Sequence, residues 1–224
     1  MIDTVFSLAT DFHVLVVDDG SPDGTAKLIK EQQKKYPQAL FLLERTGKQG
    51  LGTAYLTGFK WGLERSYNYF FEMDCDFSHS PHDLIRLLEA CQEGGADLAV
   101  GSRYVRGGQL ENWPWDRVFL SYGASLYVRI ITWMPVKDPT AGFICYSRRV
   151  LEKINLDKIT FKGYAFQIQM KFASYRLGFK IKEVPITFTD RVEGTSKMSK
   201  NIVSEAIWGV ILMKWRSFFN SYQL

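Results

Sequence analysis

The sequence is poor in cysteine and has no strong excess of either charge. Its 224 residues include three cysteines, Cys75, Cys91 and Cys145, whose spacing matches neither a zinc-binding pattern nor a disulfide framework. This cysteine content favours a reducing compartment. The net charge of +4 is spread along the chain, which argues against nucleic acid and suits an anionic ligand or a membrane surface.

Long hydrophobic runs are also missing. The longest apolar stretch, residues 206–213, falls far short of the roughly 20 residues needed to span a bilayer. Apolar residues still make up 46% of the chain, so a sizeable core can form. Since no linker or repeat interrupts the sequence, we expect one domain over residues 1–200. A C-terminal amphipathic helix over residues 201–224 then either belongs to this domain or contacts a membrane.

Strand and helix patterns alternate along the chain. Short apolar runs predict buried strands at residues 13–19, 39–45, 69–74 and 97–103, with further strands at 138–147 and 180–190. Helical patterns begin near Ser21–Pro22, in the glycine-rich segment 46–54 and near Ser80–Pro81, and recur at 117–133, 164–177 and 199–219. This order predicts an α/β fold in which a mostly parallel, Rossmann-like sheet is flanked by helices.

Acidic residues stand at the ends of two predicted strands. Asp18 and Asp19 end the first, and Asp74 and Asp76 end the third with the spacing D-x-D. Ligands of parallel α/β sheets bind beyond the carboxyl ends of the strands, so both pairs are expected at one edge. Two carboxylates there suit Mg²⁺ or Mn²⁺ bound together with a substrate diphosphate. The alternative is a strand-end turn in which an aspartate accepts backbone N–H bonds.

Basic residues are expected at the same edge. Arg103 ends the strand at 97–103, and Arg191 and Lys197 belong to a polar loop that contains Gly194. Such cations suit phosphate oxygens, and an arginine can bind two oxygens at once. Each of them taken alone is more often a solvated surface charge.

Together these segments are similar to a known family over nearly the whole chain. The ordered motifs are VVDDGSPDGT, GLGTAYLTGF, MDCDFSHSP, GSRY, KGYAFQIQM and EVPITFTDRVEGTSK. They resemble the polyprenol- or dolichol-phosphate mannose synthases, which are inverting family 2 glycosyltransferases with the GT-A fold. D-x-D alone is a short motif, whereas the ordered set is specific.

The resemblance implies roles for the strand-end residues. Asp74 and Asp76 would contact a divalent ion, Mg²⁺ or Mn²⁺, and the nucleotide diphosphate. Cys75, between them, stands where the family usually has alanine, and its small side chain should be tolerated beside the nucleotide. Asp19 and the backbone of Val17 would contact the guanosine half of the donor.

The resemblance also implies roles for four cations. Arg103 would bridge the donor and acceptor phosphates, and Arg117 would be a second arginine for the acceptor phosphate. Arg191 and Lys197 would close over the diphosphate on a mobile loop.

The sequence departs from the family in further places. Ser78 stands where some members have a glutamine near the metal, and Tyr122 replaces a usual arginine, which predicts weaker acceptor binding. The family's first strand, with a P-T-Y-N-E-like motif, is absent, and residues 1–12 match the helix that follows it. We therefore expect a chain that is truncated at its N-terminus relative to the family.

The implied reaction moves mannose from GDP-mannose to a polyprenyl or dolichyl monophosphate, with inversion. A phosphate monoester has its second pKa near 6, so its oxygen is already anionic at neutral pH and needs no dedicated general base. Accordingly, His79 and His82 are expected to be structural. The expected location is peripheral, on the cytoplasmic face of a membrane, where a membrane-anchoring partner subunit is a candidate partner.

Two other functions remain open at this point. One is a related transferase that moves glucose or another hexose to the same lipid, because no residue separates these sugars by physics alone. The other is an inactive remnant that serves as a binding or scaffold protein, since the first strand of the family is missing.

Overall fold

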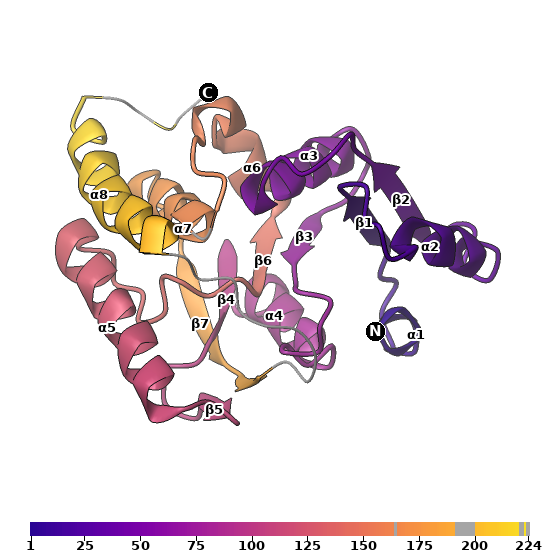
Figure 1. Cartoon of the computed structure of the whole chain (residues 1–224), viewed down its shortest axis with the longest axis horizontal. Coiled ribbons are helices and arrows are strands. Elements are labelled where there is room, and N and C mark those ends of the chain that lie inside the picture. Colours follow the sequence, from indigo (N-terminus) through magenta and orange to yellow (C-terminus); the bar gives the residue numbers. More distant parts are fainter. Residues whose placement is uncertain (164, 191–199, 220–221, 223–224) are drawn as a thin grey trace.

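A four-stranded sheet forms the centre of the computed structural model, which describes residues 1–163, 165–190, 200–219 and 222 (Figure 1). Its strands follow the order β3 (Tyr69–Glu72), β6 (Ile144–Ser147), β4 (Leu98–Ser102) and β7 (Ile181–Pro185). β4 and β7 are parallel, whereas β6 runs antiparallel to both of its neighbours. Every residue of β4 is buried, as expected for a strand covered on both faces.

Two smaller strand pairs accompany this sheet. β1 (Val14–Asp18) and β2 (Leu40–Glu44) form a parallel pair, of which β1 packs against α3 (Figure 1). β5 (Gln109–Glu111) and β8 (Thr187–Thr189) form another parallel pair beyond the end of β7. Within the described residues, neither pair is hydrogen-bonded into the four-stranded sheet.

Helices surround these strands. In chain order they are α1 (Ile2–Phe6), α2 (Thr25–Gln33), α3 (Leu51–Leu63), α4 (Asp83–Gln92), α5 (Trp115–Thr132), α6 (Arg148–Lys153), the short 3-10 helix η1 (Leu156–Lys158), α7 (Ala165–Arg176) and α8 (Lys200–Arg216). α4 packs on β4, β6 and β7, and α2 packs on β1 and β2. α3 contacts β1 on one side and β3, α6 and α7 on the other, so it joins the β1–β2 pair to the rest of the molecule. α5 and α8 lie side by side (Figure 1).

The largest buried cluster lies between the four-stranded sheet and the helices α3, α6 and α7. It includes Phe59, Leu98, Ile144, Tyr146 and Phe166. A second cluster joins α4 to the other face of the sheet, and a third lies among α5, α7 and α8. This arrangement confirms the predicted α/β fold with parallel strands and flanking helices.

Two predicted helix starts were too early. α2 begins at Thr25 rather than near Ser21, because the Asp18 carboxylate accepts the N–H groups of Gly20 and Ser21 and holds this segment in a turn. Gly24 then enters the helix with a φ of +82°, a conformation that glycine adopts without strain. α4 begins at Asp83, after a short turn that starts at Ser80.

None of the helices that the structure describes combines the length and the apolarity that crossing a bilayer requires.

Candidate active site

The D-x-D residues lie in a turn directly after β3. One oxygen of Asp76 accepts the N–H of Ser78 at 3.0 Å, so this carboxylate does take part in a strand-end turn. Phe77, between these two residues, has a φ of +60°, which is unusual for a bulky side chain. The thiol of Cys75 is exposed, and desolvation together with the charges of Asp74 and Asp76 raises its pKa. The turn is therefore held in a strained shape with acidic groups beside each other.

His79 lies behind this turn and is buried against the rings of Phe143 and Phe188. Burial lowers the pKa of His79 to about 4, and the charge of Arg103 acts in the same direction. The charge of Asp76 opposes this shift. The ring of Phe188 lies 5.1 Å from the ring of His79 and 5.5 Å from the guanidinium of Arg103. His79 is thus a neutral packing residue, as the sequence predicted. Through the ring of Phe188 it brings the segment that follows the D-x-D turn close to Arg103.

Arg103 is held by a buried carboxylate that the sequence analysis missed. Its Nε and Nη2 donate to the two oxygens of Asp138 at 2.7 Å each, and its Nη2 also donates to Thr140. The side chain of Asp138 is 0% exposed and that of Arg103 is 10% exposed. Burial alone would raise the pKa of Asp138, but the guanidinium outweighs it and the pKa is lowered. Arg103 is therefore a fixed cation, and Nη1 is the guanidinium nitrogen outside these bonds.

Arg117 stands in the first turn of α5 and is held more loosely. Its Nη1 donates to Asp190 at 2.7 Å, and both side chains are more than a quarter exposed, at 29% and 26%. Its guanidinium carbon lies 3.9 Å from the centre of the Trp113 ring, which also faces Arg103 at 5.9 Å. The two arginines predicted for the acceptor phosphate therefore share one aromatic neighbour.

Asp19 and Val17 belong to a separate cluster at the end of β1. Asp19 accepts from Nε of Arg45 at 2.7 Å and from the backbone N–H of Gln49 at 3.3 Å. Arg45 also donates to Thr53 at the start of α3. Val17 pairs with Leu43 of β2. This cluster ties the ends of β1 and β2 to the glycine-rich entry of α3.

A buried titratable group just before the D-x-D turn was also missed. Glu72, the last residue of β3, is 0% exposed, and burial raises its pKa to about 8. Lys171 on α7 is equally buried, and burial lowers its pKa to about 8. Its ammonium donates to the carbonyls of Ala141 and Gln167 at 2.6 and 3.0 Å. The sequence signals were a glutamate that ends an apolar strand and a lysine that stands between apolar residues of a predicted helix.

Other predicted residues stand as follows. Ser78 is buried, and Tyr122 is half-exposed with its ring edge against Tyr104. Arg191 and Lys197 lie outside the described residues.

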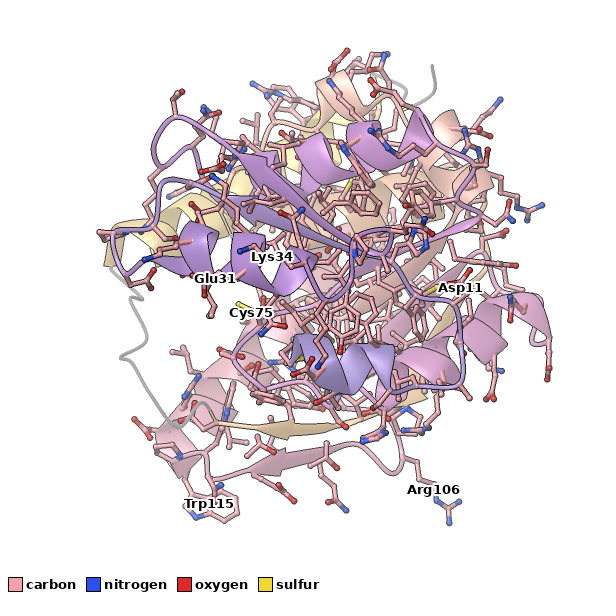
Figure 2. The ribbon with its side chains drawn as sticks, turned by 90° about the vertical axis from the view of Figure 1, so that its right-hand side faces the viewer. Asp11, Glu31, Lys34, Cys75, Arg106 and Trp115 are labelled. Carbon is pink, nitrogen blue, oxygen red and sulfur yellow. The ribbon has the colours of Figure 1, made fainter. Side chains whose placement is uncertain are left out.

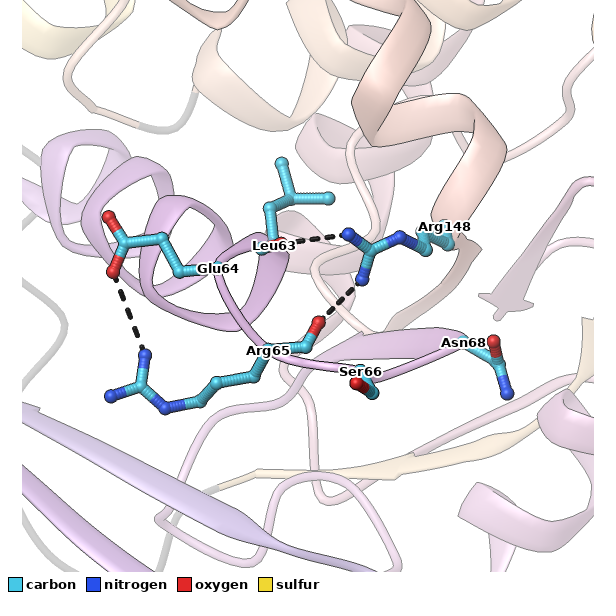
Figure 3. A pocket seen from close by; sticks show the side chains of 6 residues that line it. All are labelled: Leu63, Glu64, Arg65, Ser66, Asn68 and Arg148. Atoms are coloured by element: carbon cyan, nitrogen blue, oxygen red, sulfur yellow. Dashed lines mark hydrogen bonds and ion pairs between the residues drawn. The ribbon is translucent and has the colours of Figure 1, made fainter.

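A hollow at the opposite edge of the sheet has no comparable chemistry. It is lined by Leu63, Glu64, Arg65, Ser66, Asn68 and Arg148, at the C-terminal end of α3 (Figure 3). Arg148 donates to the carbonyls of Leu63, Arg65 and Tyr67 and to the carboxylate of Glu152. Its guanidinium is therefore used to cap the helix and is not offered to a ligand.

The donor set at the D-x-D turn fits a hard divalent ion that is completed by a ligand. Asp74 and Asp76 supply two carboxylates, and Mg²⁺ or Mn²⁺ often takes one or two carboxylates together with substrate phosphates and waters. Among the described residues, no group of three or more acidic, histidine or cysteine side chains forms a metal site made by protein alone.

Comparison with known proteins places these residues in a family. Residues 1–155 match the model of glycosyl transferase family 2. The chain is 50% identical over 203 residues to the polyprenol monophosphomannose synthase of Mycolicibacterium smegmatis, covering 88% of this chain and 76% of that protein. It is also 50% identical over 202 residues to the undecaprenyl-phosphate mannosyltransferase of Micrococcus luteus, covering 88% and 82%. The dolichol-phosphate mannosyltransferase of Pyrococcus furiosus is 38% identical, and the chain spans 56% of its length.

A solved structure agrees in fold. Glucosyl-3-phosphoglycerate synthase from Mycobacterium tuberculosis, in complex with Mn²⁺, UDP and phosphoglyceric acid, superposes with a TM-score of 0.63 at 18% identity. The match covers 95% of this chain and 70% of the other. At this identity the likeness shows the shared fold alone. From the family model and the two relatives at 50% identity, the chain belongs to glycosyl transferase family 2, and within it to the polyprenyl-phosphate mannosyltransferases.

Proposed function

We propose that this protein transfers mannose from GDP-mannose to a polyprenyl phosphate, with inversion at the anomeric carbon. The observation that carries the proposal is packing on one ring: His79, which follows the D-x-D turn, and Arg103, at the end of β4, lie 5.1 and 5.5 Å from the ring of Phe188. This brings acidic ligands for a phosphate-bound cation next to a fixed guanidinium. The names of the relatives at 50% identity support a mannosyl donor and a polyprenyl phosphate acceptor.

The chemistry requires little from a general base. An oxygen of the lipid phosphate forms a bond to the anomeric carbon, the bond from that carbon to the donor diphosphate breaks, and GDP leaves with the electron pair. Since the attacking phosphate oxygen is already anionic at neutral pH, no proton has to be removed. The buried, neutral His79 agrees with a site that works without a base.

The main task of the site is then to hold two anionic groups together. Arg103, fixed by Asp138, would offer Nη1 at the point where the donor and acceptor phosphates meet. Asp74 and Asp76 would hold Mg²⁺ or Mn²⁺, which when bound neutralises charge on the leaving diphosphate. Asp19, oriented by Arg45, would contact the nucleoside side of the donor.

The acceptor phosphate is assigned to the first turn of α5. Arg117 lies there, and the N-terminal end of a helix also favours an anion. Trp115, at the same helix start, is 88% exposed and points outward (Figure 2). A phosphate bound at this point would have its lipid chain beside apolar side chains.

An apolar surface continues from there along α5 and α8. Its exposed members are Trp115, Phe119, Leu120, Tyr122, Leu126, Ile130, Trp133, Ile207, Trp208, Ile211, Leu212, Trp215, Phe218 and Phe219. Tyr127 donates to the carbonyl of Ile207, and Lys214 donates to the carbonyl of Thr132, so the two helices are tied together. We therefore treat the C-terminal helix as part of the domain and propose that its exposed face, with that of α5, lies in the membrane interface.

Replacement of Asp76 tests this function. Asp76→Ala should abolish transfer of radiolabelled mannose from GDP-mannose to polyprenyl phosphate in the presence of Mn²⁺, while the melting temperature stays close to that of the wild type. The control is Asp157→Ala, which removes an exposed aspartate paired with Lys60. Transfer by Asp76→Ala at near the wild-type rate would overturn the assignment of the D-x-D turn.

A donor comparison separates mannosyl transfer from its alternatives. The wild-type protein should use GDP-mannose at least about tenfold better in kcat/KM than UDP-glucose, because specificity is a difference in transition-state binding. A preference for UDP-glucose would favour another hexosyl transferase. No transfer from either donor would favour a binding or scaffold protein.

A further inference from the structure

Trp113 lies beside the two arginines that are expected to bind the acceptor phosphate. Its ring stacks on the guanidinium of Arg117 at 3.9 Å and meets the ring of Phe188 edge to face at 5.5 Å. The guanidinium of Arg103 faces the same two rings, at 5.9 Å from Trp113 and 5.5 Å from Phe188. One indole therefore contacts the two cations that the acceptor phosphate is expected to meet.

The local backbone fixes this ring. Asn112, just before it, has a φ of +62°, and Pro114, just after it, is the N-cap of α5. The preceding strand β5 pairs with β8, and the N–H of Asp190 donates to the carbonyl of Glu111. Trp113 is thus clamped between the start of α5 and the end of β8, rather than free on a loop.

Arg117 needs such support because its other contact is weak. Arg103 has a bidentate bond to a fully buried aspartate, whereas Arg117 has a single bond to a partly exposed one. A long side chain that must be ordered on binding lowers affinity. Stacking on an indole orders the guanidinium beforehand and leaves its edge, with the N–H groups, for phosphate oxygens.

We propose that Trp113 is a positioning residue for the acceptor phosphate, which holds the guanidinium of Arg117 by its ring face. This inference rests on the proposed function, in which Arg117 binds that phosphate. The indole selects arginine at position 117, because a lysine would keep the charge but lose the flat group that stacks.

Steady-state kinetics of ring variants tests the inference. Trp113→Leu should raise the KM for polyprenyl phosphate about five- to tenfold, with the KM for GDP-mannose and kcat changed less than about twofold. Trp113→Phe, which keeps a weaker ring face, should raise the acceptor KM about two- to threefold. In an Arg117→Ala background, Trp113→Leu should have no further effect on the acceptor KM.

The chain offers a matched control in a second arginine–indole stack. The guanidinium of Arg65 lies 3.8 Å from the ring of Trp61, outside the candidate site. Trp61→Leu should lower the melting temperature by an amount similar to Trp113→Leu and leave the acceptor KM unchanged.

The outcomes separate this inference from the proposed function. If Arg117→Ala raises the acceptor KM and Trp113→Leu does not, the inference is wrong and the role of Arg117 stands. If Arg117→Ala has no effect on it, the role of Arg117 is wrong, and the inference fails with it. Equal effects of Trp113→Leu on both substrates would make Trp113 structural. Should the leucine variant fail to fold, an unchanged acceptor KM in Trp113→Phe would overturn the inference.

Discussion

The β1–β2 pair is much less buried than the four-stranded sheet, although each carries predicted site residues at its strand ends. All of β4 is buried, whereas in β1 only Asp18 is. β4 has hydrogen-bonded neighbours on both sides, and within the described residues β1 pairs with β2 alone. The residues assigned to the phosphates therefore follow strands of the buried sheet. Asp19, which is assigned to the nucleoside, follows a strand pair that depends on ion pairs and on α3.

An aspartate–arginine pair at a strand end occurs in both regions and allows a direct comparison. Asp138→Ala leaves the buried Arg103 without its carboxylate and should lower the free energy of unfolding by about 3–5 kcal/mol. Asp19→Ala removes a carboxylate that is 24% exposed and leaves Arg45, which is 7% exposed, bonded to Thr53. Because water reaches the Asp19 side of this pair, the loss should be smaller, about 1–3 kcal/mol. Urea unfolding of both variants measures this difference. Equal losses would show that the two regions are equally embedded.

Amide hydrogen exchange compares the strands themselves. The amides of β4 should exchange at least about 100-fold more slowly than those of β1, because β4 opens only with the whole core and β1 opens locally. Exchange at neutral pH, resolved by residue, is the measurement. Similar protection in the two strands would contradict the idea that the β1–β2 pair is the less stable region.

The contact between the two regions passes through α3. A Cβ on Gly52 would lie 2.6 Å from the backbone oxygen of Phe161 and 2.8 Å from the side chain of Phe166. Gly52→Ala should therefore move α3 and lower the free energy of unfolding by about 1–3 kcal/mol. Thermal melting measures this change.

A glycine in open space is the control for this substitution. Gly123 lies inside α5 and a Cβ there would meet no atom within 4 Å. Gly123→Ala should raise the free energy of unfolding by about 0.5–1 kcal/mol, because alanine favours the helix. A stable Gly52→Ala protein would show that α3 does not pack as tightly as the structure indicates.

The pH dependence of the free energy of unfolding tests whether Glu72 is protonated in the folded core. The pKa of Glu72 is raised by burial to about 8 from its ordinary value of 4.5, so the folded state holds a proton that the unfolded state releases. This contribution to stability is complete below pH 4.5 and is lost as the pH rises through about 8.

Glu72→Gln removes this titration. Between pH 5 and pH 8 the wild type should lose about 3 kcal/mol more stability than the variant, because one proton is released on unfolding across nearly this whole window. Urea unfolding at pH 5, 6.5 and 8 gives the two slopes. Parallel slopes would mean that Glu72 stays ionised in the folded protein.

Much of the fold was predictable from local patterns. The apolar runs predicted β1 to β4 near their observed bounds, and the acids after β3 predicted the position of the D-x-D turn. The strand predicted at 138–147 begins only at Ile144, and the one predicted at 180–190 is divided into β7 and β8. Both follow from nearest neighbours in the chain, because a buried strand needs consecutive apolar residues and a ligand edge lies at its carboxyl end. The direction of β6 was not predictable, since antiparallel pairing with β3 and β4 depends on where a long connection returns.

The partners of the site residues were decided by tertiary structure. Asp138 reaches Arg103 across 35 positions of sequence, and Lys171 enters the core near Glu72 from a distant helix. Trp113 and Trp115 show that the sequence does not predict contacts even for residues that are close together in the chain. They stand two positions apart in the sequence, yet one stacks on Arg117 and the other is 88% exposed. The sequence by itself places two tryptophans before and at the start of α5. Only the packing of the first turn of α5 against the end of β8 decided which of them faces the site, because burial depends on neighbours that are distant in the chain.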